Sequence, residues 1–287
     1  PNIAAALVGR GVGPARTTPH RARPIDPSNS AEVQVCAVEV KICMPDTNSE
    51  NLAVPKVVIM DSPKIIPIIL EKEIIEVLDK HLVEYKEPGM DRFNKPGWTN
   101  RTWSNMSIRR AHVDVVDARE TKGLWMAHIC LFPMTKNGGP IYGFDIIAGK
   151  NKITGAFHDF SPLLKKEHPL TRWFIEENKW FKPSKVRELP DWAKAIFSEG
   201  MIAAGNVQEE RELNQICTMA VSNLNAYIDK IGHFNSDSNE EDVIRAQNFY
   251  CENQQKNPHT PKTMQSLGLP EEDIKLFCAD NLFPTIK

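Results

Sequence analysis

Short runs of alternating apolar and polar residues fill the middle of the chain, and Gly, Pro, Asn and Lys separate one run from the next. This alternation has the period of a β-strand, and runs that follow one another at this spacing are typical of an antiparallel meander. The five predicted strands are Trp98–Ser104, His112–Val116, Trp125–Phe132, Tyr142–Ala148 and Ile153–Phe160. A sixth run, Glu32–Cys43, either forms another strand or belongs to an extension that precedes the domain.

Helical patterns lie on both sides of this block of strands. Ile, Leu and Val recur every three or four positions over Pro63–Tyr85, and Pro67 confines the regular helix to its carboxyl side. The five helices predicted after Pro162 are Leu163–Asn178, Asp191–Ala204, Glu209–Lys230, Asn239–Lys256 and Pro270–Leu282. Strands followed by helices predict an α+β fold, in which helices cover a mostly antiparallel sheet.

The composition is that of an ordinary globular protein, with 41% hydrophobic and 25% charged residues. A formal net charge of −2 argues against a general nucleic-acid binder. No apolar run reaches the roughly 20 residues that a membrane-spanning helix needs, so we expect no membrane span. The six cysteines form no CxxC pair, which favours free thiols in a reducing compartment over a disulfide framework or a zinc ribbon.

The beginning of the chain has its own composition. Residues 1–25 contain four arginines, no lysine and no acidic residue. An Arg-rich, acid-poor segment without periodicity is typical of an organellar transit peptide, and a disordered tail without a targeting role is the alternative. We therefore expect residues 1–35 to form a disordered, transit-peptide-like extension and residues 36–287 to form a single domain.

Four ionisable residues lie within the predicted sheet: His112, Asp114, His128 and Asp145. Residues two apart in a strand share a face, so His112 and Asp114 point the same way. Whether His128 and Asp145 share that face depends on the strand register, which the pattern does not give. Such a set is consistent with a metal site, an acid–base site, a solvent-exposed face of the sheet or a group of polar residues that satisfy one another. The exposed face is favoured for His112 and Asp114.

Asp145 and His128 have apolar neighbours in sequence, which predicts that both are buried. Burial raises the pKa of a carboxyl and lowers that of a histidine. A buried Asp beside a His can therefore hold a proton near neutral pH and deliver it. Because no GxSxG, GxxxxGK[ST] or strand-linked dinucleotide motif accompanies the pair, the chemistry indicated is proton donation.

Several segments, taken in order, resemble the ferredoxin-dependent bilin reductases. They are LWMAHICLFP at 124–133, GFDIIAG at 143–149, FSP at 160–162, IFSE at 196–199, YCENQQKN at 250–257 and NLF at 281–283. The resemblance covers roughly residues 95–287 and is greatest to the phycocyanobilin-forming branch of that family. Any one segment would be weak, but their order over this length is specific.

The resemblance implies a fold and an activity. The fold is a three-layer α/β/α sandwich with a central antiparallel β-sheet and helices on both faces. The substrate is biliverdin IXα, an open-chain tetrapyrrole held between the sheet and the carboxyl-terminal helices. No metal or flavin is bound; reduced ferredoxin, a 2Fe-2S protein, supplies electrons singly and the protein supplies protons. The resemblance also implies a monomer, and together with the Arg-rich leader it implies the plastid stroma of a photosynthetic eukaryote.

Residue by residue, the resemblance gives Asp145 the role of protonating the bilin and His128 that of its partner. His112 matches a histidine on the same face, and Asn257 matches the phycocyanobilin-forming branch. Asp114 stands where that branch has a glutamate that protonates a vinyl group, and Pro258 follows Asn257 where that branch has an acid. These two departures favour instead a reductase that forms phycoerythrobilin or 15,16-dihydrobiliverdin.

Substrate contacts are also implied. Residues 201–206 lack the arginine expected to hold a propionate, and the proposed substitutes are Lys256, His259 and Lys262. Met126 and Phe144 are candidate walls of the flat slot that a conjugated substrate needs. The missing arginine leaves open a carrier that binds a tetrapyrrole without chemistry. The segment 163–194 holds eight Lys/Arg against five Asp/Glu, which suits either a solvated helical face or a docking site for ferredoxin.

Overall fold

A computed structural model describes residues 62–287 apart from 151, 166 and 235–237, and the side chains from residue 70 onward. The expected extension over residues 1–35 and the run Glu32–Cys43 lie outside the described residues. The single domain over 36–287 and the plastid location therefore stay predictions.

Seven strands form one antiparallel sheet, and their spatial order is their order in the chain. The strands are β1 Val83–Tyr85, β2 Trp98–Ser104, β3 Ile108–Ala118, β4 Leu124–Pro133, β5 Ile141–Ala148, β6 Ile153–Ser161 and β7 Ile202–Val207. All five predicted strands are confirmed. Successive side chains of a strand point to opposite faces of the sheet, so two faces with different surroundings give the sequence a period of two. Sequential antiparallel neighbours need only short connections, which matches the closely spaced Gly, Pro and Asn turns.

The two edge strands were not predicted. The helix expected to reach Tyr85 ends earlier, as α1 Ser62–His81, and β1 follows it. The helix expected over Asp191–Ala204 is wrong: only α4, Asp191–Lys194, is helical there, and β7 begins at Ile202. A helix through Gly200 would be disfavoured, whereas an extended segment satisfies the free backbone edge of β6. Tertiary pairing thus overrides the helical tendency of the alanines.

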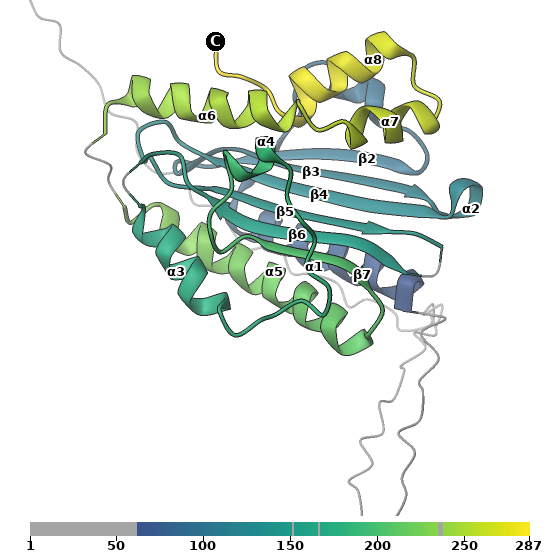
Figure 1. Ribbon diagram of the computed structural model, residues 1–287. Coiled ribbons are helices and arrows are strands. Elements are labelled where there is room, and N and C mark those ends of the chain that lie inside the picture. Colours follow the sequence, from purple (N-terminus) through teal and green to yellow (C-terminus); the bar gives the residue numbers. More distant parts are fainter. Residues whose placement is uncertain (1–61, 151, 166, 235–237) are drawn as a thin grey trace, which may run out of the picture. The chain divides into compact units, whose positions relative to one another are not determined.

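Helices cover both faces of the sheet (Figure 1). Three of them, α1, α3 Pro169–Asn178 and α5 Glu210–Ile231, lie on one face. The other face carries α4, α6 Glu240–Gln254, α7 His259–Ser266, α8 Glu271–Leu276 and a π-helical turn, η2 Phe277–Leu282. Two more short helices are η1 Met90–Phe93 and α2 Arg119–Lys122. The three-layer α/β/α sandwich is therefore confirmed.

Side chains along each strand alternate between the two faces of the sheet and so contribute to two separate hydrophobic cores. Trp125 and Phe144 point to the α1/α5 face and are fully buried there. On the opposite face, Cys130 and Phe132 of β4 pack with Tyr250 of α6. Each large apolar side chain buried in this way contributes about 1.5–3 kcal/mol, so both helical layers are held to the sheet.

Within the described part of the chain, no helix combines the length and apolar character needed to cross a membrane.

Candidate active site

One row of side chains crosses five strands on the α6–α8 face of the sheet. Asn100 lies directly opposite Asp114, Asp114 opposite His128, His128 opposite Asp145 and Asp145 opposite Phe157. Directly opposed residues in an antiparallel pair have Cβ atoms about 4.5–5.5 Å apart. The register, which the sequence pattern left open, therefore brings Asp114, His128 and Asp145 together on one face.

His128 and Asp145 form an ion pair, with the imidazole Nδ1 2.5 Å from the carboxylate Oδ1. The His128 side chain is 6% exposed, whereas that of Asp145 is 38% exposed. Burial alone would lower the pKa of His128, but the adjacent Asp145 carboxylate and its hydrogen bond outweigh burial and raise that pKa to about 10. The pair therefore holds a proton on the imidazole at neutral pH. The expectation that Asp145 is buried is wrong, because its side chain borders an open cleft.

The buried carboxyl of the site is Asp114, which is 1% exposed. Burial raises its pKa to about 6, even though the Trp98 indole N–H donates a 2.5 Å hydrogen bond to its Oδ1. His112, two residues earlier, is fully buried, and burial lowers its pKa well below the ordinary value. The solvent-exposed interpretation of His112 and Asp114 is wrong, because the C-terminal helical layer covers this part of the sheet.

Four polar atoms of this cluster have no hydrogen-bond partner in the part of the chain that the structure describes. They are Asn100 Nδ2, His112 Nδ1, Asp114 Oδ2 and His128 Nε2. Among the described residues, the His112 ring has one hydrogen bond, from Nε2 to Asn100 Oδ1 at 3.0 Å. Each unsatisfied buried polar group costs about 1–3 kcal/mol. A fold that retains four of them side by side sacrifices stability at this place, as functional sites do.

A cleft of about 560 Å³ opens beside the row at Asp145. Flat aromatic walls come from Phe157, Trp192 and Phe197. The remaining lining residues are Ile147, Met201, Gln254, Asn257, His259 and the segment 187–194 around Trp192. A slot of this volume that combines apolar walls with polar side chains is suited to a small molecule.

The predicted substrate contacts are only partly brought together. Asn257 and His259 line the cleft. Lys256 does not, since its Nζ donates to Asn253 Oδ1 at 2.9 Å, and Lys262 lines a separate hollow on α7. Met126 lies on the correct face, half-buried against the C-terminal helices.

Phe144 is outside the site. It is the chain neighbour of Asp145, so it points to the opposite face, where it is fully buried in the α1/α5 core. The prediction that it forms a wall of the slot is therefore corrected. Phe157, the cross-strand neighbour of Asp145, occupies that place instead.

Sequence reasoning also missed residues that complete the site. Asn100 and Trp98 alternate within a correctly predicted strand, so their shared face was readable, but their contact with Asp114 required the register. Asp159 accepts hydrogen bonds from the backbone N–H and the hydroxyl of Ser198 and so anchors the segment that carries Trp192 and Phe197. Burial raises the pKa of Asp159 to about 6.

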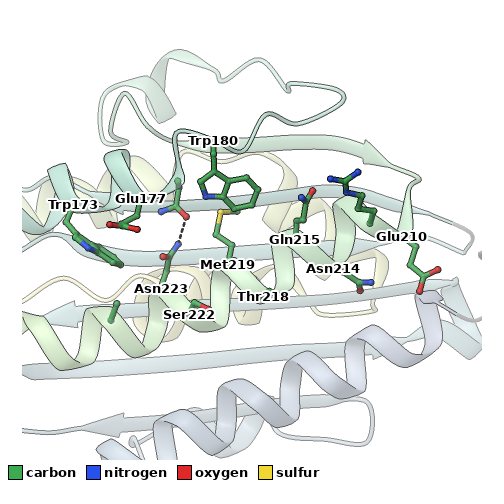
Figure 2. Close-up of a pocket in the computed structure, with 13 residues that line it drawn as sticks. Trp173, Glu177, Trp180, Glu210, Asn214, Gln215, Thr218, Met219, Ser222 and Asn223 are labelled. Carbon is green, nitrogen blue, oxygen red and sulfur yellow. Dashed lines mark hydrogen bonds between the residues drawn. The ribbon is translucent and has the colours of Figure 1, made fainter. Parts of the chain in front are cut away.

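A second cavity, of about 770 Å³, lies on the other side of the sheet between α3 and α5. Figure 2 shows Trp173, Trp180 and Met219 around it, and the hydrogen bond from Asn223 to Asn178 beside it. None of the four ionisable residues predicted for the site lines this cavity.

Among the residues described, no group of three or more His, Cys, Asp or Glu side chains is arranged to hold a metal ion.

Fold and site together define a class: an α/β/α sandwich protein that presents an acid–base pair to a cleft with aromatic walls. A family model described as ferredoxin-dependent bilin reductase matches residues 85–268. The chain belongs to this family, whose members are oxidoreductases that take electrons from ferredoxin. The family resemblance noted in the sequence is thereby confirmed.

Individual relatives agree. The phycocyanobilin:ferredoxin oxidoreductase of Synechococcus sp. (strain CC9605) is 33% identical over 119 residues, which span 41% of this chain and 47% of that protein. The enzyme of the same name from Synechococcus elongatus is 26% identical over 173 residues, 58% of this chain and 67% of that protein. The chain thus matches about half the length of the first relative and two thirds of the second.

Two solved structures share the fold. That of PcyX is 57% identical in sequence, with a TM-score of 0.59, and the match covers 77% of this chain and 99% of that one. Tomato phytochromobilin synthase, solved in complex with biliverdin, is 13% identical with a TM-score of 0.58, and the match covers 75% of this chain and 81% of that one. At that identity the tomato structure supports the sandwich fold alone.

Proposed function

We propose that this protein reduces biliverdin IXα to a phycobilin with electrons delivered singly by reduced ferredoxin. The observation that carries the proposal is the His128–Asp145 ion pair at the edge of a cleft with aromatic walls, backed by buried polar atoms that have no partner among the described residues. Membership of the ferredoxin-dependent bilin reductase family supplies the substrate class and the electron donor.

In this proposal the chain's own residues supply protons. His128 is protonated at neutral pH, and Asp145 lies between it and the cleft. Each electron added to a conjugated tetrapyrrole raises the basicity of its nitrogen and oxygen atoms. A proton from the pair neutralises that charge, which would be costly in an apolar slot. Asp114, opposite His128 and with a pKa of about 6, is the second proton source.

The proposed product is phycocyanobilin, on the strength of His128 and of Asn257, which lines the cleft. Phycoerythrobilin or 15,16-dihydrobiliverdin is the alternative product, favoured by Asp114. Its side chain is one methylene shorter than glutamate and is already held by Trp98. Chromatography of the product distinguishes these outcomes in a single assay.

The test is an anaerobic turnover assay with biliverdin and reduced ferredoxin, followed by absorption and by chromatography of the pigment. The expected result is loss of the biliverdin absorption with formation of a phycobilin. If biliverdin changes its absorption on binding but is never reduced, the protein is a tetrapyrrole carrier and the proposal is wrong.

A further inference from the structure

One buried hydrogen bond joins the ionisable row of the site to an aromatic residue outside the cleft. The indole N–H of Trp98 in β2 donates to Asp114 Oδ1 at 2.5 Å, and both side chains are buried. We infer that Trp98 is a positioning residue of the site: it holds the Asp114 carboxyl in one orientation and leaves Oδ2 as the oxygen that carries the proton. This inference rests on the proposed function and deepens it, because Trp98 acts on the reaction through Asp114.

The strand register explains why Trp98, and not its neighbour Asn100, holds the carboxyl. Asn100 lies directly opposite Asp114, but its Oδ1 pairs with the His112 ring at 3.0 Å. Trp98 lies opposite Val116, which makes it the diagonal neighbour of Asp114 on the same face of the sheet. Diagonal neighbours are about 7–8 Å apart, a separation that an aromatic side chain can span. The length of the indole therefore brings its N–H to a carboxyl that lies on the adjacent strand.

Packing fixes the indole in place. Trp98 is 3% exposed. The centroid of its ring lies 4.9 Å from that of Phe277 in η2, in an edge-to-face arrangement, and 5.8 Å from that of Phe93 in η1. A ring that is packed from two directions keeps its N–H aimed at Asp114, so the carboxyl is oriented by a rigid donor.

The hydrogen bond makes the two oxygens of Asp114 unequal. An indole N–H is a donor only, so Oδ1 is the acceptor. A protonated carboxyl has one carbonyl oxygen and one O–H group, and the carbonyl oxygen is the better acceptor, so the proton of Asp114 lies on Oδ2. Oδ2 is buried and has no partner among the described residues. The proton is thus placed on the oxygen of this carboxyl that remains free to deliver it.

The same bond favours release of the proton. In the step that Asp114 serves, the O–H bond at Oδ2 breaks and the proton passes to a bilin that has accepted one electron from ferredoxin. The electron pair of that bond stays on the Asp114 carboxylate, and the Trp98 N–H stabilises the resulting negative charge. Burial raises the pKa of Asp114 to about 6, and the hydrogen bond from Trp98 opposes this rise. Trp98 therefore both places the proton and helps it to leave.

Other ionisable groups face Asp114 from the neighbouring elements. Across the sheet, His128 of β4 lowers the pKa of Asp114 and Asp145 of β5 raises it. From the helical layer, Cys278 of η2 lies near the carboxyl, and burial together with the Asp114 charge raises the pKa of its thiol to about 11. In the described part of the chain none of these three groups donates a hydrogen bond to Asp114, so loss of the indole N–H should raise the pKa of Asp114.

The experiment removes the indole N–H and compares it with an equivalent loss elsewhere. Trp98→Phe keeps an aromatic ring but has no N–H. Trp103→Phe is the matched control, because Trp103 is a buried residue of the same strand whose indole donates to a carboxylate, Asp79 Oδ1, at 2.8 Å. Its ring, however, belongs to the α1/α5 core. A second variant carries benzothienylalanine at position 98, which retains the shape of indole with sulfur in place of the N–H, and it decides the question where Trp98→Phe does not fold.

We expect Trp98→Phe to bind biliverdin within about threefold of unmodified protein, since Trp98 does not line the cleft. The single-turnover rate of phycobilin formation should fall by about tenfold, the scale of one hydrogen bond to a charged group, and partly reduced pigment should accumulate. The decline of the rate that accompanies deprotonation of Asp114 should move to higher pH. The benzothienylalanine variant should show the same changes, and Trp103→Phe should show none of them.

A double variant tests whether the effect passes through the carboxyl. In an Asp114→Asn background, Trp98→Phe should change the rate by less than about twofold, because the indole then has no proton to place. A further tenfold loss in that background would show a general effect of Trp98 on the site and would overturn the positioning role.

An unchanged rate, pigment composition and pH profile in both variants at position 98 would also overturn it. Equal losses in Trp98→Phe and Trp103→Phe would do the same, since they would reflect weaker packing of β2. These outcomes leave the proposed function intact if unmodified protein reduces biliverdin. Failure of unmodified protein to reduce biliverdin would overturn the proposed function and the positioning role together.

Discussion

The imidazole Nδ1 of His128 lies 2.5 Å from Oδ1 of Asp145, across the paired strands β4 and β5. The two residues contribute opposite properties to one pair, since the histidine is enclosed and the aspartate reaches the cleft. A buried imidazolium is stable only because the carboxylate compensates its desolvation. The pair thus stores a proton inside the protein and exposes the group through which that proton can leave.

Replacing Asp145 should return His128 to the neutral form. In Asp145→Asn the carboxylate is lost but burial remains, so the pKa of His128 should fall from about 10 to below its ordinary value of 6.5. The measurement is an NMR titration of the histidine ring resonances in both proteins. A His128 that still titrates near pH 10 in the variant would show that another group holds its proton.

Asp145→Asn should also separate ligand binding from turnover. Because Asn cannot release a proton, we expect the rate of biliverdin reduction to fall by about 10²-fold or more. Biliverdin affinity should change by less than about threefold, since Asn has nearly the same shape. The measurements are single-turnover reduction and absorption titration. Asp117→Asn, at the far end of β3 and paired with Arg119, is the control carboxylate. Wild-type turnover by Asp145→Asn would exclude the catalytic role.

Asp114 should make stability depend on pH between about 4 and 6. Burial raises its folded-state pKa from 3.8 to about 6, so over that interval the folded protein binds more protons at this site than the unfolded chain does. The stabilising contribution is therefore complete below pH 3.8 and is lost as the pH rises through 6. A shift of about two units corresponds to roughly 3 kcal/mol.

Asp114→Asn removes this titration. The free energy of unfolding of the variant, measured by urea denaturation, should gain on that of unmodified protein by on the order of 3 kcal/mol between pH 4 and pH 7. Comparing the two proteins at each pH cancels the similar titration of Asp159. A difference that stays constant over this interval would contradict the assignment of Asp114 as the buried, proton-holding carboxyl.

Two phenylalanines test which face of the sheet binds the ligand. Phe144→Leu should lower the free energy of unfolding by on the order of 1–2 kcal/mol, because Phe144 is fully buried in the α1/α5 core. It should leave the dissociation constant for biliverdin within about twofold. Phe157→Leu should weaken biliverdin binding and leave the free energy of unfolding nearly unchanged, because Phe157 is half-buried and lines the cleft. Weaker binding in Phe144→Leu than in Phe157→Leu would indicate that the ligand binds on the α1/α5 face, which contradicts the proposed site.

Period-2 alternation in the sequence was sufficient to predict β2 to β6 and to show that His112 and Asp114 share a face. The order of the segments that resemble the family also indicated the family, and the family implied the sandwich. Both inferences use information that is local along the chain. A strand's alternation depends on its own residues, and a motif is recognised without knowing what it touches.

Tertiary structure alone decided the rest. A shift of one residue in register would send a whole strand's side chains to the other face, so only the packed sheet could place Asp114 opposite His128 and Asp145. Burial likewise depended on the helical layers: α6 to α8 and η2 cover Asp114, while Asp145 borders the cleft. The sequence analysis had predicted the opposite for both residues, burial for Asp145 from its apolar neighbours and an exposed face of the sheet for Asp114. Exposure is set by what packs over a side chain from distant parts of the chain.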